Sequence, residues 1–224
     1  MPRSGLNVDP VYHGCYWVMF WGSTLGWGVR AWHRDRLPPD GPMLLVSNHV
    51  SHIDPPLVGM LVGQPCTYLA RHDLFKVPGL AWLIRKLGAV PIDRESGKDG
   101  LTAVLKLLAE GKRVVMFPEG TRSPDGELQP LKPGVALLVK KARCPVVPVG
   151  IAGAYESWPK SRKFPVPAPL GVFGPGAPIG VSFGEPVPPG FYDRMAREQI
   201  VADLQARIAA TVTDARLRRN DRSG

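Results

Sequence analysis

Apolar and polar residues alternate in blocks along most of this 224-residue chain. Short, mostly apolar runs predict strands at residues 43–47, 66–70, 88–92, 113–117, 145–151 and 180–184. Helical patterns lie between them at residues 55–63, 79–87, 98–110 and 133–143. Because this order is typical of strands joined by crossover helices, we predict an α/β fold. We expect one domain over residues 37–215, with a mostly parallel sheet flanked by helices.

The C-terminal part of the chain shows two further patterns. Apolar residues recur at every fourth position and predict an amphipathic helix that docks on the domain: Ile200, Leu204, Ile208 and Val212. Residues 216–224 hold four arginines, which indicates a basic tail that is either solvated or in contact with lipid. Residues 156–178 are rich in proline, glycine and lysine and predict a long loop near a binding site or a membrane.

The N-terminal segment, residues 1–36, contains an uncharged aromatic stretch over residues 11–29. Glycine, serine and threonine dilute its apolar character, and tryptophan and tyrosine favour the headgroup zone of a bilayer. We therefore predict an interfacial helix and not a membrane span, with one face formed by Trp17, Phe20, Trp21 and Leu25. Gly22 and Gly26 would form a smooth face for close packing. The alternative is a helix buried against the core, and we expect no secretory signal.

The charge of the chain narrows the class of partner. The formal net charge of +9 favours an anionic partner, such as membrane lipid, a phosphorylated substrate or nucleic acid. Nucleic acid is not expected, because the sequence has neither zinc-finger spacing nor the aromatic run of an RNA-binding motif. Three scattered cysteines without paired spacing, Cys15, Cys66 and Cys144, do not suggest a disulfide framework.

Candidate chemistry begins directly after the first strand-like run, at Asn48-His49-Val50-Ser51-His52-Ile53-Asp54. Folding of this loop would bring the Asp54 carboxylate onto one ring nitrogen of His49 and leave the other to take a proton from a substrate hydroxyl. Asp54 precedes two prolines, which also suits a residue that caps a helix. Two other interpretations are a structural histidine and a metal site made of His49, His52 and Asp54.

A second block, Phe117-Pro118-Glu119-Gly120-Thr121-Arg122-Ser123, follows another strand-like run. Its proline and glycine favour a turn whose backbone N–H groups approach a ligand closely. Arg122 adds a fork of donors suited to a phosphate or carboxylate. An ordinary turn with a solvated arginine is the alternative.

With these two blocks the chain resembles the glycerolipid acyltransferase family, which includes 1-acyl-glycerol-3-phosphate acyltransferase. The first family motif, Asn-His-x-x-x-x-Asp with a serine two residues after the histidine, is matched by Asn48, His49, Ser51 and Asp54. The other motifs resemble residues 88–94, 117–123 and 147–149, and Lys132-Pro133-Gly134 lies where the family has a basic residue and a glycine. All four motifs occur in order within residues 43–151.

The resemblance implies a role for individual residues. His49 is expected to be the base and Asp54 its orienting partner, with no metal ion and no cofactor. The elements expected to bind the acceptor are Arg71, Arg94, Glu119, Gly120, Thr121 and Arg122. Arg71 departs from the family pattern, because related enzymes often carry lysines in this segment.

The implied activity is transfer of an acyl group from acyl-CoA or acyl carrier protein to 1-acyl-glycerol-3-phosphate (lysophosphatidate), which yields phosphatidate. Another lysophospholipid or glycerol 3-phosphate remains an alternative acceptor. From other classes, a metal-dependent hydrolase and a non-catalytic membrane-binding protein also remain open. We expect a peripheral or monotopic location on the cytoplasmic face of the cell membrane, in contact with anionic lipids.

Overall fold

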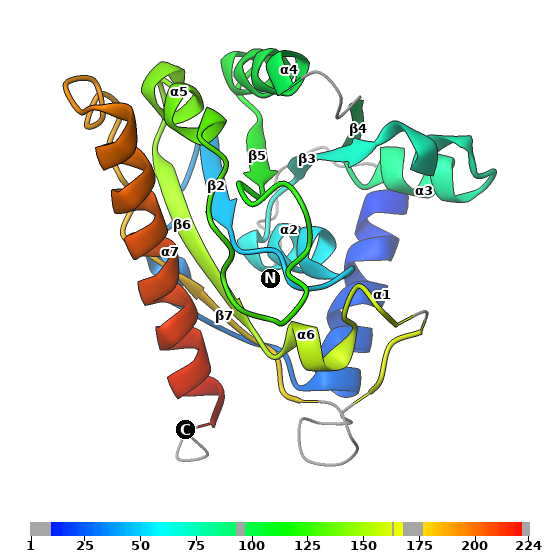
Figure 1. Ribbon diagram of the computed structural model, residues 1–224. Coiled ribbons are helices and arrows are strands. Elements are labelled where there is room, and N and C mark those ends of the chain that lie inside the picture. The colour runs from blue at the N-terminus through cyan, green and yellow to red at the C-terminus, as the bar shows by residue number, and fades with distance from the viewer. Residues whose placement is uncertain (1–9, 93–96, 163, 168–176, 221–224) are drawn as a thin grey trace.

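A computed structural model describes residues 10–92, 97–162, 164–167 and 177–220 (Figure 1). Its core is a seven-stranded sheet in the order β1-β7-β6-β2-β5-β3-β4, in which only the β6–β7 pair is antiparallel. The predicted α/β fold with a mostly parallel sheet is therefore confirmed. The strands are β1 Arg30–Trp32, β2 Met43–Ser47, β3 Cys66–Arg71, β4 Ala89–Ile92, β5 Arg113–Met116, β6 Val146–Ala152 and β7 Gly180–Phe183.

Helices cover both faces of the sheet (Figure 1). They are α1 Pro10–Trp27, α2 Asp54–Val62, α3 Leu80–Lys86, α4 Gly97–Ala109, α5 Gly134–Lys141, α6 Ala154–Ser157 and α7 Arg197–Asn220. Two short 3-10 helices, η1 Arg34–Arg36 and η2 His72–Lys76, complete the described elements. The strands predicted from the sequence all form, and no strand end differs from its predicted position by more than one residue. The strand β1, the helix α6 and the two 3-10 helices were not predicted.

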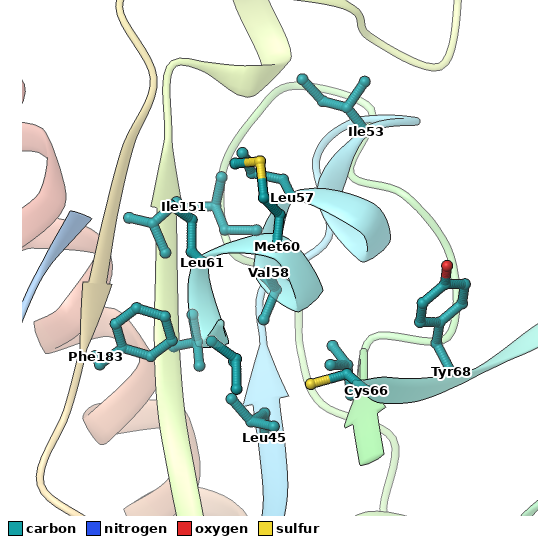
Figure 2. Packing of buried hydrophobic residues seen from close by; sticks show 14 of the residues in the cluster. Leu45, Ile53, Leu57, Val58, Met60, Leu61, Cys66, Tyr68, Ile151 and Phe183 are labelled. Carbon is teal, nitrogen blue, oxygen red and sulfur yellow. The ribbon is translucent and has the colours of Figure 1, made fainter. Parts of the chain in front are cut away.

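Alternate residues of the central strands pack into two separate cores. Leu45, Ile151 and Phe183 point toward α2 and contact Leu57 and its neighbours, as Figure 2 shows. Leu44 and Val46 point to the opposite face, which α4, α5 and α7 cover. Because both faces are covered, the central strands are apolar along their whole length, as parallel strands usually are.

The C-terminal helix α7 lies along β6 and β7. Ile200, Leu204 and Ile208 are fully or almost fully buried there, which agrees with the predicted docking face. The helix continues to Asn220, so the predicted boundary between residues 215 and 216 falls inside a helix. The arginines at positions 216, 218 and 219 pair with Glu127, Asp214 and Glu156 and do not form a separate tail.

The N-terminal helix α1 packs on the core with one side only. Tyr16 and Ser23 are its buried residues, and Phe20 is half-buried against the same core. The predicted aromatic face is therefore wrong for Phe20, and the outward side carries Trp17, Val18, Trp21 and Leu25. Gly22 and Gly26 border open space and not a packing partner.

The predicted N-terminal segment is also joined to the sheet, because β1 pairs with β7. Within the described residues, no helix has both the length and the apolar character needed to cross a bilayer.

Close packing of α7 on the sheet depends on Gly150 of β6. A Cβ atom placed on Gly150 would lie 2.2 Å from backbone atoms of Thr211 and Val212. We expect Gly150→Ala to lower the free energy of unfolding by about 3 kcal/mol or more, since α7 would have to move away from the sheet. Urea unfolding measures this change. Gly22→Ala is the matched control, because a Cβ there meets no atom within 4 Å; a loss of similar size in the control would contradict the argument.

Candidate active site

The first and third motifs lie side by side at one edge of the sheet. β2 ends at Ser47 and its parallel neighbour β5 ends at Met116, so the loops that begin at Asn48 and Phe117 leave the sheet at the same edge (Figure 1). The carboxyl edge of parallel strands is where ligands bind in many α/β proteins.

His49 and Asp54 form a hydrogen-bonded pair in the β2–α2 loop. Nδ1 of His49 lies 2.9 Å from Oδ2 of Asp54, whose side chain is completely buried. The same Oδ2 accepts the backbone N–H groups of Val50 and Ser51, each at 2.7 Å. Asp54 is the first residue of α2, but its carboxylate bonds to the preceding loop and does not cap the helix. The expected contact between the two side chains is present, and the capping role is not.

Two polar residues of the first motif, Asn48 and Ser51, attach this loop to the rest of the domain. The Asn48 amide donates to the carbonyl of Ile151 at 2.9 Å and accepts from its N–H at 2.8 Å, which fixes the end of β2 against β6. Ser51 donates its hydroxyl to the carbonyl of Trp158 at 2.7 Å. The asparagine and serine of the first motif are therefore structural supports of the histidine.

The third motif holds His49 from the other side. The Phe117 ring stacks on the imidazole with centroids 4.2 Å apart. The backbone N–H of His49 donates to Oε1 of Glu119 at 2.6 Å, and the carbonyl of His49 accepts the N–H of Ser123 at 2.7 Å. Ring, amide and carbonyl of His49 are thus each fixed by this one loop.

Glu119 was expected to contact the acceptor, but the structure places it inside the protein. Its side chain is 4% exposed. Its second oxygen, Oε2, accepts the N–H of Gln129 at 3.0 Å. Burial raises the pKa of Glu119 to about 7, although the two backbone N–H donors act in the opposite direction. This arrangement gives Glu119 the role of positioning His49.

Gly120 forms the turn of the third motif with φ of 72°. Its N–H donates to the carbonyl of Phe117, so this amide is already used within the turn. A Cβ on Gly120 would lie 2.5 to 2.9 Å from the Lys132 side chain. Lys132 therefore extends across the turn and places a cation beside the His49 loop. The sequence motif Lys132-Pro133-Gly134 did not predict this contact with Gly120.

The arginines expected to bind the acceptor differ in their surroundings. Arg122 is half-buried and lies close enough to His52 to help lower the pKa of that imidazole, which burial lowers most. Thr121 is exposed. Arg71, at the end of β3, is exposed and pairs with Asp73. Arg94 lies outside the described residues. The structure thus brings Arg122 to the His49 loop and keeps Arg71 on a neighbouring strand.

The alternative of a metal site finds no geometric support. Over the described ranges, no three His, Cys, Asp or Glu side chains are arranged to hold an ion. His52 turns its ring toward Trp158, with centroids 5.1 Å apart.

The family model for acyltransferases matches residues 29–152, more than half of the sequence, and the chain belongs to this acyltransferase family. Among curated proteins, it is 36% identical over 124 residues to the chloroplastic 1-acyl-sn-glycerol-3-phosphate acyltransferase BAT2 of Brassica napus, which is 54% of this chain and 36% of that protein. It is 30% identical over 132 residues to the 1-acyl-sn-glycerol-3-phosphate acyltransferase of Bacillus subtilis, or 58% of this chain and 65% of that protein.

These alignments span about a third to two thirds of the curated relatives' lengths. Among solved structures, the crystal structure of PlsC, the 1-acyl-sn-glycerophosphate acyltransferase of Thermotoga maritima, superposes with a TM-score of 0.70 at 25% identity. That match covers 96% of this chain and 79% of the Thermotoga chain.

The position of Glu119 leads to a test of its role. Glu119→Gln presents an NH₂ group to one of the two backbone N–H donors, so the His49 loop should shift and kcat should fall by about tenfold or more. The Michaelis constant for the acceptor should change little. Steady-state kinetics separate the two effects; a variant that raises only the acceptor Michaelis constant would restore the expected acceptor contact.

The raised pKa of Glu119 also gives a pH-dependent test. A carboxyl group with a raised folded-state pKa contributes stability that is present below about pH 4.5 and is lost as the pH rises through about 7. Thermal melting of the wild type should therefore lose stability across this interval more steeply than melting of Glu119→Gln. Parallel pH profiles would contradict this assignment.

Proposed function

We propose that this chain transfers a fatty acyl group from acyl-CoA or acyl carrier protein to the free hydroxyl of 1-acyl-glycerol-3-phosphate, which gives phosphatidate. The observation that carries the proposal is the His49–Asp54 pair, fixed by two loops at the carboxyl edge of the sheet. Membership of the acyltransferase family and the activity of the relatives that the chain resembles support it.

In this mechanism Nδ1 of His49 donates to Asp54, so Nε2 is the nitrogen that accepts a proton. Nε2 takes the proton of the acceptor hydroxyl as its oxygen attacks the thioester carbonyl. The carbonyl π electrons move onto oxygen and give a tetrahedral oxyanion. Collapse of this intermediate breaks the C–S bond, and the thiolate leaves and takes the proton from His49. The buried Asp54 carboxylate stabilises the imidazolium between these steps.

The two buried thiols and the serine hydroxyls of the first and third motifs favour direct transfer over an acyl-enzyme. Burial raises the pKa of Cys66 to about 12 and that of Cys144 to about 11, so both are protonated at neutral pH. Ser51 donates its hydroxyl to a backbone carbonyl and Ser123 donates to Asp125. Neither hydroxyl donates to His49, which a serine nucleophile would require.

The acceptor phosphate would lie beside the third motif. Arg122 supplies a bidentate donor near the His49 loop. Gly120 and Thr121 shape the turn, and Lys132 adds a second charge across it. Arg71, the last residue of β3, and Arg94 of the second motif would add further contacts to the acceptor.

A peripheral location on the cytoplasmic face of the membrane would suit such substrates. The outward side of α1 carries Trp17, Val18, Trp21 and Leu25 and supports insertion into the interface by the segment 1–36. The net charge of +9 supports attraction to anionic lipid.

The assay that tests the function is product formation by purified protein with acyl-CoA or acyl carrier protein and a panel of acceptors. The panel contains lysophosphatidate, other lysophospholipids and glycerol 3-phosphate. Phosphatidate formed from lysophosphatidate at the highest kcat/KM is the expected result. A higher kcat/KM with another acceptor would reassign the substrate, and no thioester consumption with any acceptor would overturn the proposal.

The catalytic pair is tested by three variants. His49→Ala should reduce kcat by roughly 10²–10⁴-fold, because the general base is removed. Asp54→Asn should also be severe, since it changes the hydrogen bond that orients the imidazole. His52→Ala is the matched control from the same loop and should retain most activity. A loss in His52→Ala equal to that in His49→Ala, with the fold intact by circular dichroism, would favour a site that uses both histidines.

The acceptor contact is tested at Arg122. Arg122→Ala should raise the Michaelis constant for lysophosphatidate far more than that for acyl-CoA, because a charge-assisted contact contributes about 1.5–3 kcal/mol. Arg122→Lys should restore affinity only in part, because an ammonium group lacks the bidentate fork. Equal effects on both substrates would place Arg122 outside the acceptor site.

A further inference from the structure

The segment from Arg71 to Lys86, which contains η2 and α3, carries several exposed apolar side chains. Leu74, Val77, Leu80 and Trp82 have between 37% and 56% of their surface exposed. Neither η2 nor α3, both fully within the described residues, contains a buried residue. Phe75 and Ile84 pack against the core from the inner side, so the segment is attached to the domain while its outer side faces outward. We call this outer side the 71–86 surface.

The charges of the 71–86 surface suit an anionic partner. Residues 77–84 carry no charge, and basic residues flank them at Lys76, Arg85 and Lys86. With Arg71, the segment holds four arginines and lysines against the single carboxylate of Asp73. An apolar centre with basic flanks is typical of a segment that lies in the interface of an anionic bilayer.

The position of the segment agrees with this partner. Leu87, directly after α3, lines the same small cavity as Tyr12 and Met19 of α1, so the two elements are neighbours, and Figure 1 shows them on the same side of the molecule. In the described part of the chain, eight of the twelve exposed large hydrophobic residues lie on α1 or on the 71–86 surface. Exposed apolar side chains gathered over adjoining elements mark an interaction surface.

The segment also follows a strand that ends at the same edge of the sheet as the His49 loop. β3 is parallel to β5, which is parallel to β2, so the carboxyl end of β3 at Arg71 lies at the sheet edge that carries His49. A bilayer against the 71–86 surface would therefore border the edge at which a lipid acceptor is consumed.

We propose that the 71–86 surface is a second membrane-docking element, which inserts Val77, Leu80 and Trp82 into the interface of an anionic bilayer while Lys76, Arg85 and Lys86 contact lipid phosphates. Together with α1 it gives the domain two attachment points and a defined orientation. The proposal rests on the proposed function only in that the acceptor is a membrane lipid; vesicle binding itself needs no catalysis.

The test is flotation of the full chain with vesicles of phosphatidylcholine containing phosphatidylglycerol. Val77→Ser/Leu80→Ser/Trp82→Ser should lower the vesicle partition coefficient by about tenfold or more, because three apolar side chains leave the interface. The matched control is Leu137→Ser/Phe191→Ser/Leu217→Ser, which removes three exposed hydrophobic residues from α5, α7 and the loop before α7 and should bind as the wild type does.

A second variant keeps the apolar residues and reverses two charges. Lys76→Glu/Lys86→Glu should bind phosphatidylglycerol vesicles several-fold more weakly and pure phosphatidylcholine vesicles equally well. Both surface variants should keep wild-type activity on a short-chain, soluble lysophosphatidate.

Unchanged vesicle binding by both surface variants, with activity intact, would overturn the docking proposal alone. A wild type that binds vesicles but consumes no thioester would overturn the proposed function alone.

The main competing occupant is a second copy of the chain. Light scattering in the absence of lipid should show the same mass for the wild type and the serine variant. A wild-type dimer that becomes a monomer in the serine variant, with vesicle binding unchanged, would assign the 71–86 surface to self-association and overturn the membrane proposal.

Discussion

The hydrogen bonds made by one oxygen of Asp54 determine the geometry of the site. A completely buried carboxylate is costly unless donors surround it, and Oδ2 accepts the His49 ring and the N–H groups of Val50 and Ser51. All three donors belong to the loop that Asp54 itself closes, so the spacing between histidine and aspartate follows from the turn they share. The position of Asp54 in the first turn of α2 adds the favourable field of the helix N-terminus.

The rest of the carboxyl edge is arranged to hold this loop. Asn48 pairs with Ile151 of β6, and the turn after β5 holds His49 through Phe117, Glu119 and Ser123. Two residues of the third motif differ in position, since Glu119 is buried against the backbone of His49 whereas Arg122 is half-buried near His52. If His49 is the base, as we propose, its proton-accepting nitrogen needs a closely fixed position, and the contacts that converge on this residue would provide it.

The sequence predicts the central strands and the contact between His49 and Asp54 because both depend on local patterns. Strands covered on two faces are continuous apolar runs, and the His49–Asp54 contact closes a short loop. Features formed by contacts across the fold were missed. Residues 30–32 become a strand only because β7 offers a free edge, and the arginines at 216 to 219 remain helical where carboxylates of distant segments receive them. No sequence pattern indicates that Glu119 meets the amides of His49 and Gln129.

The two faces of the sheet differ in a way that fits an enzyme at a lipid surface. On one face α4, α5 and α7 cover the core, and the C-terminal arginines of α7 pair with carboxylates, as is usual beside water. On the other face α1 covers the core incompletely and keeps tryptophans on its outer side, and α3 exposes more apolar residues next to it. Water makes such exposure costly, whereas a bilayer removes the cost. Under the proposed function, this apolar surface would bring the domain to the phase in which a lipid acceptor is dissolved.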